Sequence, residues 1–326
     1  MRIMVQRVAG ALTGLLRDAA GASMTLYKLM IPAIIAVKVL KEAGGVDFLG
    51  DLLSPVMQIV GLPGEMGLVW ATAMLTSLYA GIMVLAAICG DVSLTVAQMT
   101  VIASLMLVAH ALPVELRIAQ QAGSRVLFMT GMRLIGAFAY GSLLDSIYKW
   151  GGWLQEPCVL NWIPQSADPG LLAWTVTQLK SLVLIFVMIT ILMAALKTLK
   201  WLKITDLLIR LLSPLLRPLG IGGSAITMTI IGMTLGIGYG GGLIINEARS
   251  GGIDTRDVFF SMTLMGLMHS IFEDTAVMAL IGGALSGILW GRLAFAVVFT
   301  FLLAKMLPVL SENAVHRYFF RKSIAG

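Results

Sequence analysis

The chain has 326 residues, of which 58% are hydrophobic and only 12% are charged, and its mean hydropathy is +0.92. Soluble domains carry about 25% charged residues, so this composition excludes an ordinary soluble protein and indicates an integral membrane protein. The net charge of +6 does not imply nucleic-acid binding, because Lys and Arg gather in the cytoplasmic segments of membrane proteins.

In chain order, the first half predicts an N-terminal amphipathic helix and then a repeat that covers residues 23–148. The helix at 1–22 is interrupted by charges and is expected to lie at the membrane interface. The repeat is predicted to contain a span at 24–42, a Pro-containing amphipathic segment at 46–60, a long span at 65–89, apolar arms at 94–110 and 113–123, and a last span at 127–148. A span needs about 20 residues, so the two arms predict a re-entrant hairpin with His110 at its tip.

The second half predicts the same order of elements after a linker at 149–172. The linker contains Trp150, Trp153 and Trp162, and is expected to lie outside. The second repeat, 173–310, is predicted to contain spans at 173–197, 223–248 and 289–310, an amphipathic segment at 203–219, and a hairpin over 257–283 with His269 at its tip. Residues 311–326 are expected to form a cytoplasmic tail.

A constant offset of 159 residues aligns the two halves without gaps. Residues 52–55 and 211–214 both read LLSP, His110 falls on His269, and Glu115 falls on Asp274. The other matches include Gly61 with Gly220, Gly81 with Gly240, Gly123 with Gly282 and Arg133 with Arg292. Apolar matches are common in an apolar chain, whereas Pro, His, acid, Gly and Arg matches at one offset are not. The sequence therefore predicts an internal duplication.

Charge predicts that the two repeats have opposite orientations. Segment 43–64 has two Asp residues and no basic residue, whereas its counterpart 197–219 has five basic residues. The positive-inside rule places the first outside and the second inside, and three spans plus one hairpin per repeat produce that inversion. The Arg residues near both termini predict cytoplasmic ends. Arg249 and Arg256 conflict with this topology, because it places them outside.

The candidate site lies where the two predicted breaks meet, because each break carries a His followed by an acid. Ionisable residues inside a membrane are costly and are by default functional. The candidates are His110, Glu115, His269, Glu273 and Asp274, with His110, His269 and Asp274 as candidate metal ligands. A proton relay fits the same residues. Glu115 could instead be only a helix cap after Pro113, and Ser270 with Glu273 fits a capping box.

A glycine-rich stretch at 236–242 precedes Asn246 and Glu247, which complete the candidate binding residues. It does not fit a nucleotide-binding loop. Small residues there favour close helix packing, and the alternative is an unwound helix that presents carbonyls to a substrate. Arg133 and Arg292 are expected to be solvated or to snorkel at the ends of spans.

The sequence from His269 to Thr275 (HSIFEDT), the preceding Gly-rich helix and the weaker first copy resemble the nucleoside-recognition, or Gate, domain. This domain occurs in spore maturation proteins A and B, in concentrative nucleoside transporters and in bacterial ferrous-iron permeases. The resemblance covers about 45–145 and 205–310, and implies a multi-pass protein of the bacterial inner membrane. The chain is shorter than a concentrative nucleoside transporter and lacks the GTPase domain of the iron permeases.

The sequence thus predicts an all-α polytopic membrane protein made of two inverted repeats. The favoured function is secondary transport of a small polar or ionic solute by alternating access, with a proton or cation as a possible coupling ion and no required cofactor. The expected partners are the solute and membrane lipid, and a homo-oligomer is left open. The alternatives are a non-transporting membrane interaction or scaffold protein of the spore-maturation type and, less favoured because no enzyme motif is present, an intramembrane hydrolase.

Overall fold

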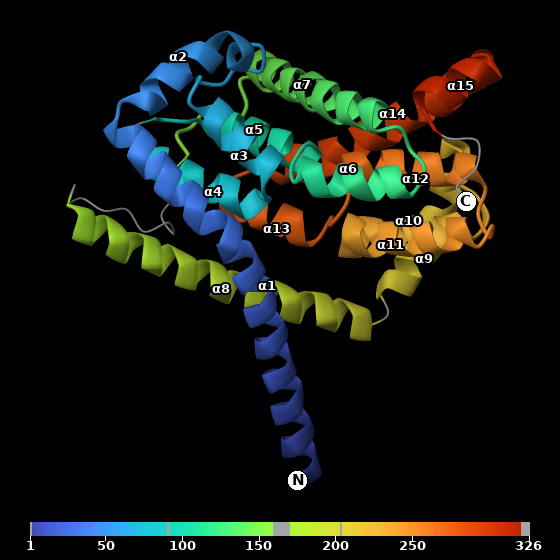
Figure 1. Cartoon of the computed structure of the whole chain (residues 1–326), viewed down its shortest axis with the longest axis horizontal. Coiled ribbons are helices and arrows are strands. Elements are labelled where there is room, and N and C mark those ends of the chain that lie inside the picture. Colours follow the sequence, from blue (N-terminus) through green and yellow to red (C-terminus); the bar gives the residue numbers. More distant parts are fainter. Residues whose placement is uncertain (1, 90–91, 159–169, 203, 321–326) are drawn as a thin grey trace.

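The computed structural model describes residues 2–89, 92–158, 170–202 and 204–320, and within these ranges all regular structure is helical apart from two isolated β-bridges (Figure 1). Five described helices are long and apolar enough to cross a membrane, and they are Thr13–Glu42, Val96–Gln121, Val126–Gly151, Leu171–Ala195 and Ser286–Val309. The spans predicted at 24–42, 127–148, 173–197 and 289–310 are confirmed as candidate membrane helices. The chain is a multi-pass membrane protein.

The helices follow one another in the same order in each half of the chain. The first half contains α1 (Arg2–Glu42), α2 (Gly45–Gln58), α3 (Met66–Leu75), α4 (Leu78–Ile88), α5 (Val96–Val108), α6 (Leu112–Gln121) and α7 (Val126–Gly151). The second contains α8 (Leu171–Trp201), α9 (Ile204–Leu216), α10 (Gly223–Leu235), α11 (Ile237–Arg249), α12 (Thr255–Leu267), α13 (Glu273–Leu280), a π-helical turn (Ser286–Gly291), α14 (Arg292–Met306) and α15 (Glu312–Tyr318). Part of the expected linker, 159–169 with Trp162, and the last residues, 321–326, lie outside the described ranges.

The first helix is continuous, which differs from the expected boundary at residue 22. No proline interrupts the chain before Pro32, so the interfacial segment and the span form one helix of 41 residues. Its N-terminal part projects from the body of the molecule, and its middle crosses α8 (Figure 1). An ion pair between Lys197 and Asp18 at 2.8 Å and a hydrogen bond from the Tyr27 hydroxyl to the Leu182 carbonyl fix this crossing.

The segments 65–89 and 223–248, which were expected to be long spans, are helical hairpins. A Cβ placed on Gly81 of α4 would lie 2.8 Å from Cβ of Ala73 in α3, so the chain folds back between them. In the second hairpin, a Cβ on Gly240 of α11 would lie 2.3 Å from Cα of Gly232 in α10. The close-packing interpretation of the glycine-rich stretch is therefore confirmed, because only small residues allow backbones to approach so closely.

Each hairpin turns at a residue whose backbone leaves the helical conformation. Ser77 is extended (φ −161°), and its side chain accepts a hydrogen bond from the Ala80 backbone N–H, which caps α4. Gly236 has φ 103°, a conformation that L side chains rarely adopt, and it ends α10. The turn chemistry thus explains why two apolar segments of span length fold into hairpins and not into single straight helices.

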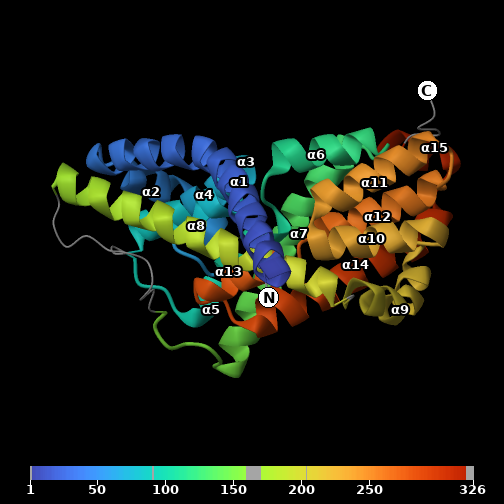
Figure 2. The same cartoon turned by 90° about the horizontal axis from the view of Figure 1, so that it is seen from below.

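The segments that carry the histidines are broken helices, and this too differs from the expected hairpins. Residues Val96–Gln121 have the length and composition of a single span, although α5 ends at Val108 and α6 begins at Leu112. In Figure 2, α5 lies toward the lower edge of the molecule and α6 toward the upper edge, and α12 and α13 lie on either side of its centre. In the first half, the segment predicted to be a hairpin thus has the form of a span, and the segment predicted to be a span is a hairpin.

This exchange removes the charge conflict at the end of α11. Because α10 and α11 form a hairpin, the chain returns after α11 to the side from which α10 began. Arg256 accordingly lines the same surface cavity as Arg217. Leu207–Leu219 and α10, which meet at a bend of 115°, together pass for a sixth candidate span, either broken or re-entrant.

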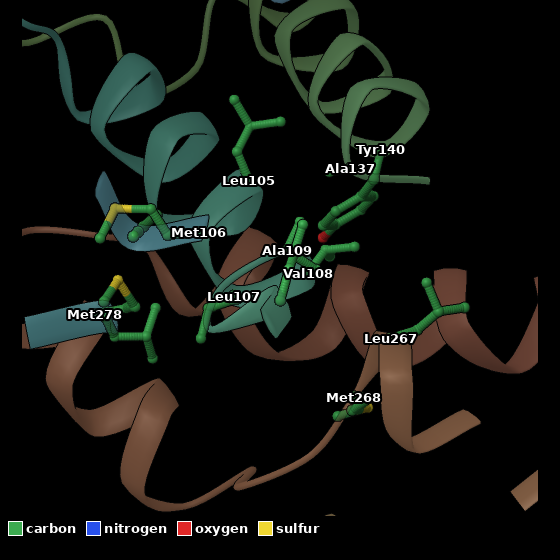
Figure 3. Close-up of a cluster of buried hydrophobic side chains, with 14 of the residues drawn as sticks. Leu105, Met106, Leu107, Val108, Ala109, Ala137, Tyr140, Leu267, Met268 and Met278 are labelled. Atoms are coloured by element: carbon green, nitrogen blue, oxygen red, sulfur yellow. The ribbon is translucent and has the colours of Figure 1, made fainter. Parts of the chain in front are cut away.

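Apolar side chains surround both helix breaks. Figure 3 shows Leu105–Ala109 at the end of α5 close to Leu267 and Met268 at the end of α12, with Tyr140 of α7 and Met278 of α13 beside them. All are buried. The two breaks therefore lie in the centre of the protein, where backbone and polar side chains need partners from the protein itself.

We expect replacement of Gly240 by Val to destabilise the protein by at least about 2 kcal/mol, because the new side chain would overlap the backbone of α10. The matched control is Gly242→Ala on the same helix, where a Cβ meets no atom within 4 Å and helix propensity favours Ala. Thermal unfolding in detergent measures both. Equal stability of the two variants would contradict the hairpin.

Candidate functional site

The site forms at the two helix breaks, which have the same local structure. His110 follows the end of α5 by two residues, and Ala111 has a left-handed backbone with φ 44°. His269 follows the end of α12 by two residues, and Ser270 has φ 46°. Non-glycine residues rarely adopt this conformation, which costs on the order of 1 kcal/mol or more. Each strained residue turns the chain so that the preceding His points into the protein.

The two imidazole rings face each other across the centre of the molecule. Nε2 of His110 lies 3.2 Å from Nε2 of His269. The Nδ1 atoms lie 2.9 and 2.8 Å from the carbonyl oxygens of Met106 and Met265, respectively. A carbonyl only accepts, so each Nδ1 carries a proton, and in the neutral ring each Nε2 presents a lone pair. The predicted convergence of the two histidines is present in the structure.

Two carboxylates flank the histidine pair. Oε1 of Glu115 lies 3.2 Å from Nε2 of both rings, and Oδ2 of Asp274 lies 3.9 Å from both. All four residues are buried, with exposed fractions between 2% and 8%. The sequence thus predicted four side chains, two from each half, that the structure brings together.

Two arginines hold the breaks in place, which sequence reasoning missed. Arg133 of α7 donates from Nε to the Val108 carbonyl and from Nη2 to the His110 carbonyl. Arg292 of α14 makes the same two bonds, to the carbonyls of Leu267 and His269. The expectation that both arginines are solvated or snorkel is wrong, because they are 2% and 0% exposed. Their match at the 159-residue offset, shared with the histidines, was the signal available in the sequence.

The two acids differ in how they are held. Arg133 donates from Nη1 to Oε2 of Glu115 in a short ion pair. Asp274 is the counterpart of Glu115 but is one methylene shorter, and its buried Oδ2 has no hydrogen-bond partner. Nη1 of Arg292, the counterpart of the Arg133 donor, is buried and unpartnered as well. The capping interpretation of Glu115 is wrong, because its carboxylate contacts Arg133 and the histidines instead of an amide of its own helix.

Glu273 lies beside the site and contacts the other half of the protein. Its Oε1 accepts a hydrogen bond of 3.0 Å from the hydroxyl of Tyr79, which follows the turn of the first hairpin. The capping box expected from Ser270 and Glu273 does not form, since α13 begins without a side-chain cap. Tyr79 is a second residue that sequence reasoning did not assign to the site.

The structure does not bring Asn246 and Glu247 to the histidines. They lie near the end of α11, ten or more residues beyond Gly236, which corresponds to about 15 Å of helix. Asn246 is exposed and Glu247 is half-buried. The turn at Gly236 is the part of this stretch that does reach the break, because a Cβ there would lie 2.8 Å from Oγ of Ser270.

The central cluster contains lone pairs without matching donors. Both Nε2 atoms, Oε1 of Glu115 and Oδ2 of Asp274 are acceptors when the rings are neutral and the acids are ionised. Buried acceptors that face one another are unfavourable unless a positive species lies between them. The arrangement is suited to a proton or a metal cation.

We expect Arg133→Met to cost about 3–5 kcal/mol, because it leaves a buried carboxylate without its partner. The double variant Arg133→Met with Glu115→Gln removes that charge, and should recover part of the loss. Arg117→Met, at an exposed position on α6, is the control and should change stability little. Thermal unfolding in detergent measures all three. A double variant no more stable than Arg133→Met would contradict the ion pair.

Comparison with known proteins shows that the sequence is similar to that of a membrane protein. Over 300 residues it is 28% identical to the uncharacterized membrane protein YvoD of Bacillus subtilis (strain 168), an alignment that covers 89% of this chain and 93% of that protein. No protein-family model matches the chain, so the resemblance to Gate domains has no support from a family match. No solved structure matches it either. The chain is thus a membrane protein distantly homologous to YvoD.

Proposed function

We propose that the protein is a secondary transporter of a small ionic or polar solute, built from two inverted repeats whose helix breaks form the transport site. The observation that carries this proposal is the 3.2 Å approach of His110 and His269, which come from equivalent breaks 159 residues apart. Discontinuous helices that meet at a buried polar site between repeats are characteristic of secondary transporters.

The duplication is supported by local geometry at the predicted offset. Helices α5 and α12 each have 13 residues, and their bounds differ by 159. The two arginines bond to carbonyls at equivalent positions, as described above. Gly123 and Gly282 have φ values of 96° and 95°, and each follows the short helix beyond its break. Independent agreement in helix ends, turns and hydrogen bonds supports a common origin of the halves.

Inversion follows if each half crosses the membrane an odd number of times. In the first half, α1, the broken helix α5–α6 and α7 cross, and the hairpin α3–α4 returns. In the second half, α8, α12–α13 and α14 cross, and α10–α11 returns. Three crossings per half place equivalent loops on opposite sides. The number of crossings equals the sequence prediction although two elements have exchanged roles.

The charge distribution supports cytoplasmic termini. Arg217 and Arg256 line the same cavity, and Arg125 donates two hydrogen bonds to the His316 carbonyl of the C-terminal helix α15. Glu156 belongs to the opposite group of loops, since its carbonyl accepts from the Val96 N–H at the start of α5. The positive-inside rule then places the basic group in the cytoplasm, in a bacterial inner membrane.

Alternating access would arise from movement of the hairpins and broken helices around the central cluster. The backbone N–H of Ala111 donates to Ala73 of the first hairpin, and that of Ile271 donates to Met233 of the second. Each break is thus joined to the hairpin of its own half, while Tyr79 and Glu273 join the two halves. Movement of one half against the other would open the cluster to one side and then to the other.

Inversion predicts opposite accessibility for the exposed, equivalent positions Gln58 and Arg217. Each is replaced by Cys in a protein whose Cys89 and Cys158 have been changed to Ser. A membrane-impermeant maleimide should label Cys at 58 from the outside and Cys at 217 from the cytoplasmic side of oriented vesicles. Labelling of both from the same side would rule out inversion.

Transport predicts flux in proteoliposomes that depends on the central cluster. A panel of divalent metals, nucleosides and small anions is tested with an internal pH-sensitive dye and with labelled solutes. His269→Ala and Asp274→Asn should reduce flux to the level of protein-free liposomes. His316→Ala removes the remaining histidine of the chain, which lies on α15, and should leave the flux unchanged. No flux with any solute, or normal flux in both site variants, would contradict the proposal.

A further inference from the structure

We infer that the central cluster is a binding site for a divalent first-row transition metal, with Nε2 of His110, Nε2 of His269 and Oδ2 of Asp274 as ligands. The inference deepens the proposed function, because it names the class of solute that the same site would take. Metal binding itself does not depend on transport, so the two are tested separately.

The distances among the three atoms fit one metal ion. The two nitrogens are 3.2 Å apart, and each lies 3.9 Å from the carboxylate oxygen. A point in the plane of this triangle lies about 2.1 Å from all three atoms, and zinc binds nitrogen and oxygen ligands at about 2.0–2.2 Å. The three atoms are therefore already spaced to coordinate a common ion.

The protonation pattern of the rings favours a metal. Each Nδ1 donates to a carbonyl of its own helix, so each neutral ring is held with Nε2 as the free ligand atom. A partner at the other nitrogen is the usual way in which proteins fix the tautomer and orientation of a metal-binding histidine. Both rings have this partner four residues earlier, which directs the two lone pairs toward the same point.

The surroundings also favour one shared cation over a single proton. Each carboxylate oxygen lies equally far from the two rings, 3.2 Å for Glu115 and 3.9 Å for Asp274. A proton on either ring would not bridge to Asp274, because 3.9 Å exceeds hydrogen-bond length. A metal between the rings would contact all three ligand atoms, including the unpartnered Oδ2 of Asp274.

Glu115 completes the site without being one of the three ligands. Its Oε1 lies at 3.2 Å from both nitrogens, close to the ligand-to-ligand spacing of about 3.3 Å in a tetrahedral zinc site. Its other oxygen is held by Arg133, so it is available as a fourth ligand at a fixed position. The 3.2 Å between the two Nε2 atoms leaves room for an ion but not for a larger molecule such as a nucleoside.

The donor set selects the class of metal. Imidazole nitrogen favours zinc, iron, copper and nickel, whereas magnesium and calcium prefer sites made of oxygen ligands. Two histidines with one or two carboxylates therefore predict preference for transition metals over magnesium and calcium. The described cysteines lie outside the cluster, so the site has nitrogen and oxygen ligands only.

The test is equilibrium dialysis of the purified full-length protein against Zn²⁺, together with Co²⁺ titration followed by visible absorption. We expect one ion per chain, no competition by millimolar Mg²⁺ or Ca²⁺, and cobalt absorption bands of a low-coordinate site with nitrogen ligands. His110→Ala and His269→Ala should weaken Zn²⁺ binding at least 100-fold, and Asp274→Asn at least 10-fold.

Two matched controls separate this site from adventitious binding. His316→Ala removes a histidine outside the site, and Asp145→Asn removes an acid that pairs with Lys149. Both should bind Zn²⁺ like the unmodified protein. Loss of binding in His316→Ala, or undiminished binding in both site-histidine variants, would overturn the inference. If a site variant does not fold, the cobalt spectrum of the unmodified protein still decides, because a spectrum of octahedral, oxygen-bound cobalt would also overturn it.

The outcomes distinguish the metal site from transport. Zn²⁺ binding at the cluster without flux of any solute would retain the site and reject transport. Flux of another solute without Zn²⁺ or Co²⁺ binding would retain transport and reject the metal. Zn²⁺ flux that is lost in Asp274→Asn and retained in Asp145→Asn would support both.

Discussion

The architecture depends on how two broken helices satisfy their backbone carbonyls inside a membrane protein. A helix end leaves carbonyls without partners, and no water is present in the bilayer core to bind them. Arg133 and Arg292 supply the missing donors, one at each break. A buried guanidinium is itself costly in a membrane. It is tolerated here because its planar fork bonds to two carbonyls of the same break at once, and this bonding fixes where the histidines can lie.

The acids at the two breaks differ by one methylene group, because Glu115 in the first half corresponds to Asp274 in the second. Glu115 is long enough to form an ion pair with Arg133, so this half contributes a neutralised and rigid acid. Asp274 leaves its Oδ2 without a hydrogen-bond partner, and Arg292 retains an unpartnered Nη1. The two halves therefore build similar sites, but only the second leaves its carboxylate without an arginine partner. A buried unpaired acid is unfavourable unless a ligand compensates it, so the asymmetry itself favours a bound cation.

The sequence predicted much of this site because chemistry repeated at one offset is detectable without a structure. His110, Glu115, His269 and Asp274 were identified from their rarity in an apolar chain and from the 159-residue spacing. The roles of Arg133 and Arg292 were missed because sequence does not distinguish an arginine near the end of a span from one that points into the protein. Asn246 and Glu247 were assigned incorrectly, since proximity to Gly236 along the chain becomes separation along a helix.

The exchange of hairpins and spans has a similar origin. Hydropathy measures whether a segment is apolar, but not whether it folds back, and both kinds of segment here are apolar and of similar length. The turns at Ser77 and Gly236 decide the outcome through backbone conformation, and Gly232 and Gly240 allow the close packing that follows. The conflict of Arg249 and Arg256 with the positive-inside rule was the available sign that 223–248 is not one straight span.

X-ray absorption at the zinc edge of the Zn²⁺-loaded protein tests most directly whether the two breaks share one cation. The structure predicts nitrogen and oxygen ligands at about 2.0–2.2 Å and the outer-shell scattering of two imidazole rings, falling to one ring in His269→Ala. A spectrum with no imidazole scattering, or one that His269→Ala leaves unchanged, would contradict a metal held between the two halves.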